Sequence, residues 1–264
     1  MNATSARPGL DLALLRVAHA PSLPAARVAR SPSSYETRLP ESGIDTRAAA
    51  RIAWPSVEAR IAVLASGAGT NLQALLDDPH VGPQVALVVS DKPGAAALDR
   101  ARARGVKAVV LEPSHYASRD EFDRALTALL EEEAIEFVLL AGYMRILGAS
   151  TVRAFRDRIL NVHPSLLPTF PGAHSIRDAL AWGLKVTGAT VHLVDEEVDH
   201  GPIVLQEPVL VLPDDDERSL HQRIQAVEHR LLPRATRLLV EGRLKVEGRL
   251  VHILGDEFDL EGEL

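Results

Sequence analysis

The sequence predicts a doubly wound α/β fold: a Rossmann-like, mostly parallel sheet followed by an antiparallel part and a C-terminal hairpin. From Arg60 onward, short apolar runs alternate with segments of helical spacing, and the runs are apolar at every position. Strands of this kind belong to a parallel sheet that helices cover on both faces. After Pro171 the chain becomes rich in β-branched runs, which indicates the antiparallel part.

The elements follow from this pattern in order. We predict strands over residues 60–66, 84–91, 106–113 and 136–142, separated by helices over 71–78, 94–105 and 119–134. The runs "ATVHLVD" (189–195) and "GPIVLQEPVLVL" (201–212) are expected to pair in antiparallel fashion. A long helix should span roughly 216–241, and "RLKVEGRLVHIL" (243–254) is expected to form a hairpin that turns at Glu247 and Gly248.

The chain divides into three parts. Residues 1–58 contain scattered Pro, Ser, Arg and Ala without a sustained period of 2 or 3.6, and we interpret them as a poorly ordered N-terminal extension. A dispensable tail or an over-long start is preferred there over an organelle transit peptide. Residues 59–254 should form the α/β domain, and residues 255–264 a C-terminal tail.

Composition excludes several classes of function. The absence of Cys rules out disulfides, thiolate catalysis and Cys-ligated zinc. A formal charge of −7 offers no basic stripe for a nucleic-acid backbone. No apolar run reaches the roughly 18 residues that span a bilayer. We therefore expect a soluble, cytoplasmic protein that binds neither nucleic acid nor a membrane.

A glycine-rich loop follows the first predicted strand. "SGAGTN" puts Gly69, Thr70 and Asn71 at the start of a helix, where backbone N–H groups can bind an anion. The loop lacks the third glycine of a dinucleotide site and the Lys of a nucleoside-triphosphate loop, so a single phosphate group fits best. A tight turn with an Asn cap would explain the same letters.

Asn161 and His163 stand in an apolar run, "ILNVHPS", that Pro164 ends. Because strand side chains alternate, both would share one face at the carboxyl end of a strand, where ligands collect in open α/β sheets. Asp199 comes just before the Gly-Pro pair of "VDEEVDHGP" and could orient His163 and favour its protonated form. Asn161 would supply an amide N–H to a developing oxyanion. These side chains would suit attack of an amine on a carbonyl carbon.

Other interpretations of these residues are open. An isolated His after a buried strand is often structural, and a metal site could be drawn from His163, His174, His192, His200 and the acids. No pair of these histidines has the helical H-x-x-x-H spacing, and we expect no metal. Ser165 has no glycine-flanked elbow to expose it, which disfavours a serine hydrolase.

Six motifs in order resemble the folate-dependent phosphoribosylglycinamide formyltransferases, also called glycinamide ribonucleotide transformylases. They are "RIAVLASGAGTNLQALL", "VVSDKPGAAALDRARARG", "LLAGYMRIL", "ILNVHPSLLPTFPG", "VTGATVHLVDEEVDHGPIVLQ" and "IQAVEHRLLP". The resemblance runs from about Arg60 to Arg249 and leaves residues 1–58 outside. It implies a purine-biosynthetic enzyme of the formyltransferase fold, either a monomer or a homodimer, acting on small molecules.

The resemblance also implies roles for individual residues. Asn161, His163 and Asp199 would be catalytic, with the formyl group coming from 10-formyltetrahydrofolate and passing to the amine of 5-phosphoribosylglycinamide. His163, as imidazolium, and Asn161 would stabilise the oxyanion, while Asp199 would keep His163 charged and assist proton transfer. The ribonucleotide would be bound by Gly69, Thr70, Asn71 and Glu228. Folate would be bound by Arg119, Met144, Arg145, Ile146, Leu147, Asn161, Asp195 and Asp199.

The sequence departs from the family pattern in two places. The first loop reads Ser-Gly-Ala-Gly-Thr-Asn where well-known members have Ser-Gly-Asn-Gly-Ser-Asn, but its glycines and final Asn are intact. His200 stands where many relatives have Gly, directly after Asp199, and is expected to alter the mobility of the folate loop.

Three other functions share part of this pattern. Formyltetrahydrofolate deformylase uses a similar Asn, His and Asp arrangement with water as acceptor, but would need an N-terminal β-α-β domain. Methionyl-tRNA formyltransferase would need a basic RNA-binding domain. A non-catalytic nucleotide sensor would keep the glycine loop and would not need His163.

Overall fold

The computed structural model describes residues 59–255. The extension expected over residues 1–58 and nearly all of the tail expected over 255–264 lie outside the described residues. Within the described part of the chain, no helix is long and apolar enough to cross a membrane.

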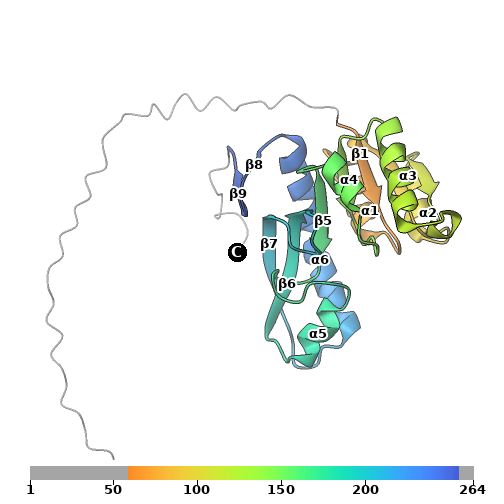
Figure 1. Ribbon diagram of the computed structural model, residues 1–264. Helices are drawn as coiled ribbons and strands as arrows, with labels where there is room; N and C mark the ends of the chain where they lie inside the picture. Colours follow the sequence, from red (N-terminus) through yellow and green to blue (C-terminus); the bar gives the residue numbers. More distant parts are fainter. Residues whose placement is uncertain (1–58, 256–264) are drawn as a thin grey trace, which may run out of the picture. The chain divides into compact units, whose positions relative to one another are not determined.

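The domain is built on one seven-stranded sheet (Figure 1). The strand order is β3-β2-β1-β4-β5-β6-β7; β1 to β5 are parallel, and β6 and β7 each run antiparallel to the strand before them. This confirms the predicted doubly wound sheet with an antiparallel part. The strands are β1 (Ile61–Leu64), β2 (Val85–Ser90), β3 (Lys107–Val110), β4 (Phe137–Leu140), β5 (Ile159–His163), β6 (Val186–Leu193) and β7 (Ile203–Leu210).

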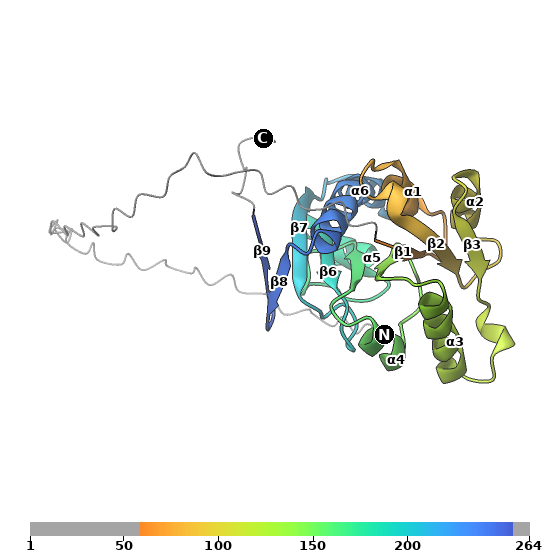
Figure 2. The same cartoon turned by 90° about the horizontal axis from the view of Figure 1, so that it is seen from above.

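Helices cover both faces of the parallel part, as its uniformly apolar strands require (Figure 2). Apolar residues of α1, α2, α5 and α6 pack on one face, and those of α3 and α4 pack on the other. The helices are α1 (Thr70–Asp77), α2 (Ala96–Ala103), α3 (Arg119–Glu132), α4 (Ala149–Ala154), α5 (Ser175–Ala181) and α6 (Glu217–Val240), with single 3₁₀ turns η1 (Gly82–Gln84) and η2 (Pro113–His115).

Polar side chains fix where the longer helices begin. The Ser118 hydroxyl accepts the backbone N–H of Glu121 at the start of α3. Asp216 and Ser219 form a reciprocal capping box at the start of α6. The long helix predicted over 216–241 is therefore α6 together with its two cap residues.

The chain closes with a separate hairpin of β8 (Leu244–Glu247) and β9 (Leu250–Ile253). Its turn residues are Gly248 and Arg249, one position later than predicted. Gly248 has φ +61° at the first turn position, as a type II′ turn requires. Leu244, Val246 and Val251 pack against the core cluster that contains α6.

The winding of the sheet reverses between β1 and β4, and ligands collect at such a switch point. The segments that follow these two strands are joined there. The backbone N–H of Ser66 donates to the Gly142 carbonyl (3.0 Å), and the Ser66 hydroxyl accepts the N–H of Met144 (3.0 Å). The glycine loop and the "MRIL" segment thus meet at the carboxyl edge of the sheet.

Candidate active site

A cavity of about 360 Å³ lies at the carboxyl end of β5, within the usual range for a small-molecule pocket. Four segments enclose it: the stretch after β4, the end of β5, the approach to α5, and the loop between β6 and β7. Its lining consists of residues 142–147, Val152, 161–164, Gly172, Ala173, Ser175, His192 and 194–199. Asn161, His163 and Asp199 are all part of this wall.

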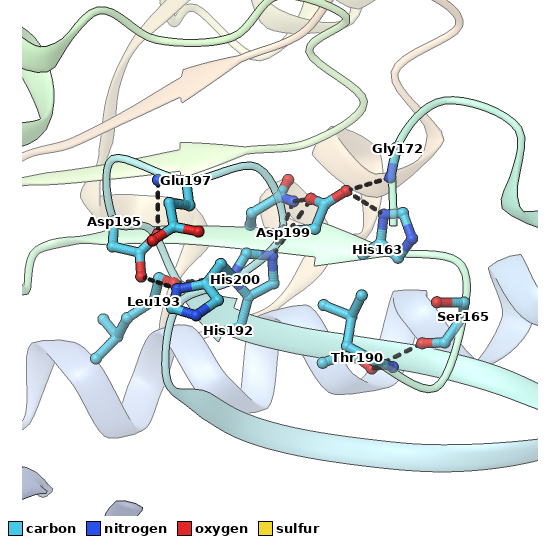
Figure 3. A network of polar contacts seen from close by, with 12 residues as sticks. His163, Ser165, Gly172, Thr190, His192, Leu193, Asp195, Glu197, Asp199 and His200 are labelled. Atoms are coloured by element: carbon cyan, nitrogen blue, oxygen red, sulfur yellow. Dashed lines mark hydrogen bonds and ion pairs between the residues drawn. The ribbon is translucent and has the colours of Figure 1, made fainter. Parts of the chain in front are cut away.

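Asp199 connects the predicted trio (Figure 3). One carboxylate oxygen, Oδ2, lies 3.3 Å from Nδ1 of His163 and accepts the Gly172 N–H at 2.7 Å. The other, Oδ1, accepts the Asn161 amide at 3.2 Å. Asp199 has φ +51°, a left-handed conformation that Asp tolerates better than most residues. The residues that sequence spacing brought together are thus in contact.

His163 is 5% exposed, and both of its ring nitrogens face acceptors. Nδ1 faces Asp199, and Nε2 lies 2.9 Å from the Phe170 carbonyl oxygen. A neutral imidazole can donate to only one of them, whereas an imidazolium can donate to both. Contacts therefore favour the charged ring, while burial opposes it.

On balance the pKa of His163 is lowered, whereas the sequence led us to expect a charged ring. Burial lowers the pKa of His163, and the Asp199 carboxylate and the Phe170 carbonyl oppose that shift without cancelling it. The sequence led us to expect that Asp199 favours the protonated ring, and its carboxylate acts in that direction; the depth at which the ring lies was not part of that expectation. Asp199 thus reduces the cost of protonating His163 but does not overcome the desolvation of the ring.

The carboxyl group of Asp199 is ionised at neutral pH. Burial by itself would raise its pKa, but the Gly172 N–H, which donates to Oδ2, and the neighbouring imidazoles hold the pKa below its ordinary value. A stable carboxylate beside His163 is what a proton-relay role requires.

His192 is a member of this network that sequence reasoning named only as a possible metal ligand. It is 2% exposed, its Nε2 lies 3.1 Å from the Asn161 amide nitrogen, and its Nδ1 donates to the Leu193 carbonyl at 2.7 Å. In this tautomer Nε2 accepts from Asn161, whose two N–H groups then bind His192 and Asp199. The sequence signal for His192 was a histidine within an apolar strand. Its contact with Asn161 depends on the pairing register of β5 with β6.

The segment between β5 and α5 is tied to β6 beneath the pocket. The Thr190 hydroxyl donates to the Ser165 carbonyl (2.7 Å) and accepts the Leu167 N–H (3.1 Å). The Ser165 hydroxyl donates to the Thr169 carbonyl at 2.5 Å and so does not face His163. This geometry disfavours Ser165 as a nucleophile.

The "MRIL" segment forms an apolar wall of the pocket. Met144 and Ile146 are 67% and 57% exposed, whereas Leu147 is buried. Exposed apolar side chains at a cavity mark a binding surface rather than core. Arg145 lies over the Phe122 ring at 4.9 Å, and Arg119 donates to the Ile146 carbonyl at 3.0 Å. Arg119 thus supports the wall from α3 and is not itself part of the lining.

Asp195 organises the loop that faces this wall. Its Oδ1 accepts the N–H of Glu197 at 3.0 Å, and its Oδ2 accepts from His200 at 2.7 Å. Gly201 is required where the loop returns to β7, because a Cβ there would lie 1.8 Å from the Leu193 carbonyl oxygen. Asp195 and Asp199, two of the residues expected to bind folate, both lie in the pocket wall.

The predicted phosphate-binding residues lie at the start of α1, outside the lining of this cavity. Gly69 is the N-cap residue with φ +70°, and a Cβ there would lie 2.7 Å from the Cα of Ala97. No side chain caps α1, so the alternative interpretation of Asn71 as a cap is wrong. The first N–H groups of α1 are left for another acceptor.

Asn71 instead contacts Glu228, 157 positions further along the chain. Its Nδ2 donates to the Glu228 carboxyl at 2.9 Å, and its Oδ1 is buried without a hydrogen-bond partner. Burial raises the pKa of Glu228, and the Asn71 amide opposes that shift. The structure thus brings the two predicted ribonucleotide-binding regions together, with an unused acceptor between them.

Across residues 59–255, no group of three or more His, Asp or Glu side chains is arranged to hold a metal ion.

An amide, an imidazole and a carboxylate lie at the carboxyl edge of a doubly wound sheet, beside an apolar pocket, an arrangement suited to group transfer. The sequence model described as formyl transferase matches residues 59–236, more than half of the 264 residues. The chain belongs to the formyl transferase family.

Relatives covered almost in full carry a more particular name. Phosphoribosylglycinamide formyltransferase of Mycobacterium tuberculosis is 48% identical over 198 residues, which are 74% of this chain and 91% of that protein. The crystal structure of glycinamide ribonucleotide transformylase 1 from Symbiobacterium toebii shares 51% identity, with a TM-score of 0.73, and the match covers 74% of this chain and 94% of that one. The resemblance stated from the six motifs is confirmed.

The chain is also similar to part of a much larger protein. It is 48% identical over 188 residues to the trifunctional purine biosynthetic protein adenosine-3 of Drosophila melanogaster, and it spans 14% of that protein's length. The likeness to the trifunctional protein therefore concerns this one domain.

Proposed function

We propose that the protein transfers the formyl group of 10-formyltetrahydrofolate to the amine of 5-phosphoribosylglycinamide. One observation carries the proposal: Asn161 and His163 both contact Asp199 in the wall of an apolar pocket. That arrangement supplies donors for an oxyanion and a route for a proton, which acyl transfer to an amine requires.

In the proposed reaction the amine attacks the formyl carbon directly. A bond forms between the amine nitrogen and the formyl carbon, the bond from that carbon to the folate nitrogen breaks, and one proton passes from the attacking to the leaving nitrogen. The tetrahedral oxyanion accepts from Asn161 and His163. Because the oxyanion adds negative charge beside the ring, it reinforces Asp199 in opposing the effect of burial on the His163 pKa.

The donors of the trio bind protein groups in this structure, so substrate must exchange with them. His163 Nε2 donates to the Phe170 carbonyl, and the amide N–H groups of Asn161 bind His192 and Asp199. In the proposal the formyl oxygen takes over the hydrogen bond that Phe170 accepts here. Asp199 keeps its contact with Nδ1 and relays the proton through water.

The folate pocket in this proposal is the described cavity. The pterin ring would pack on the apolar wall of Met144, Ile146 and Leu147, with Asp195 and Asp199 opposite it. Arg145 and Arg119 lie beside that wall and offer cations to the acidic end of the donor.

The ribonucleotide would bind at the start of α1. Its phosphate would accept the backbone N–H groups of Gly69, Thr70 and Asn71, where the positive end of the helix favours an anion. Glu228 would accept from the ribose hydroxyls. The unpartnered Oδ1 of Asn71 supports a polar ligand there. A cytoplasmic location and a monomeric or homodimeric state stay predictions.

The test is release of tetrahydrofolate by the purified protein, measured with and without 5-phosphoribosylglycinamide. We expect release that depends on the acceptor. Release without the acceptor would instead indicate a deformylase, and no release would contradict the proposal.

A His163→Ala variant separates an enzyme from a binding protein. We expect turnover to fall by about 10²-fold or more because the oxyanion donor and relay are lost. Binding of both ligands, followed by calorimetry, should persist. Unchanged turnover would rule out the assigned site.

A further inference from the structure

We propose that Arg249, in the turn of the C-terminal hairpin, is a positioning residue for the loop over residues 195–200, acting through His200. The proposal rests on the proposed function, since that loop forms one wall of the folate pocket. Arg249 lies beyond residues 59–236, the range that the family model matches.

Two contacts join the hairpin turn to the loop. One guanidinium nitrogen of Arg249 lies 2.9 Å from Nε2 and 3.4 Å from Nδ1 of His200. A single nitrogen reaches both ring nitrogens only by lying against the face of the ring. The second guanidinium nitrogen donates to the His200 backbone carbonyl at 2.7 Å. Arg249 therefore holds both the ring and the main chain of His200.

His200 passes this restraint to the pocket. Its ring binds the Asp195 carboxylate at 2.7 Å, so the two ends of the loop are linked across its width (Figure 3). His200 is also bonded directly to Asp199, whose φ of +51° and two carboxylate contacts depend on how the loop is held. A shift of His200 would thus move Asp195 and Asp199 together.

The turn geometry presents Arg249 to the loop. Gly248 occupies the first turn position with φ +61°, and Arg249 follows it at the tip. The hairpin is itself anchored by Leu244, Val246 and Val251, which pack on the core. The restraint therefore runs from the core through the hairpin to the pocket wall. A glycine at position 200 would have no ring for Arg249 to hold.

The experiment compares Arg249→Ala with Lys245→Ala, a control on the same hairpin whose side chain, among residues 59–255, pairs with Glu247 at 2.7 Å. We expect Arg249→Ala to raise KM for 10-formyltetrahydrofolate about five-fold and to lower kcat, because Asp199 moves with the loop, while KM for the ribonucleotide changes less than about two-fold. Lys245→Ala should leave all three unchanged. Equal changes in both KM values, or none, would overturn the proposal.

Two further measurements test whether Arg249 acts on the loop through His200. Because Arg249 acts through His200, the double variant Arg249→Ala/His200→Ala should be no worse than the more affected single variant; additive losses would contradict this. Hydrogen exchange of a peptide over 194–202 should be faster in Arg249→Ala than in Lys245→Ala. Hydrogen exchange does not depend on turnover, so it tests whether Arg249 restrains the loop even if the proposed formyl transfer fails.

Discussion

At the scale of single residues, Asp199 links the polar groups of the pocket because each of its two carboxylate oxygens contacts two other residues. Oδ2 contacts His163 and Gly172, and Oδ1 contacts Asn161 and His192. Alternation along a strand was enough to predict that Asn161 and His163 share a face. The contacts of His192 depend on the pairing of β6 with β5, and the position of the Phe170 carbonyl depends on that residue's φ of +49°. Neither can be read from a residue pattern.

Replacement of Asp199 by Asn tests this arrangement. The carboxylate favours the cationic form of His163 against burial, so its removal should lower the pKa of His163 below the wild-type value. Titration of the ring by NMR measures this, and kcat should fall by about 10²-fold or more. An unchanged or raised pKa of His163 would show that Asp199 does not act on the ring.

At the scale of elements, the alternation of strands and helices was predictable because each parallel strand must be apolar on both faces. The hairpin was predictable too, but its turn lies at Gly248 and Arg249 rather than at Glu247 and Gly248, since only the former puts glycine at the positive-φ position. The contact of α1 with α6 through Asn71 and Glu228 spans 157 positions and depends on tertiary packing.

The junction of β1 and α1 can be tested by a pair of alanine variants. Gly69→Ala would strain a φ of +70° and push a Cβ to 2.7 Å from Ala97, whereas a Cβ at Gly67 would meet nothing within 4 Å. We expect Gly69→Ala to raise KM for the ribonucleotide about ten-fold or more, because the N–H groups at the start of α1 move. Gly67→Ala should change it little. Equal effects would contradict a phosphate site at Gly69.

At the scale of the whole molecule, the sheet order places both predicted ligand regions at one edge. The glycine loop follows β1, the apolar wall follows β4, and Asn161 and His163 end β5, and these three strands are neighbours. Doubly wound topology made this edge predictable from sequence. The separation of the region at the start of α1 from the cavity was not predictable, because side chains decide which surfaces the pocket includes.

Acid stability is a property of the whole fold that the buried imidazole of His163 and the half-buried imidazole of His229 should influence. Burial lowers the pKa of both His163 and His229 in the folded protein. Below about pH 6.5 the unfolded chain therefore binds protons that the folded rings bind less readily, so stability is retained above that pH and lost as pH falls. Urea unfolding at pH 7.5 and 5.5 should show a smaller difference in His229→Asn than in wild type. An equal or larger difference in His229→Asn would contradict the prediction that His229 makes the folded protein less stable at low pH.

The most direct test of the central claim follows the formyl carbon itself. With 10-formyltetrahydrofolate labelled at that carbon and 5-phosphoribosylglycinamide present, the account predicts that the label appears in the formylated amide, in amounts equal to the tetrahydrofolate released. Label recovered as formate, or tetrahydrofolate released without labelled amide, would contradict direct transfer to the amine.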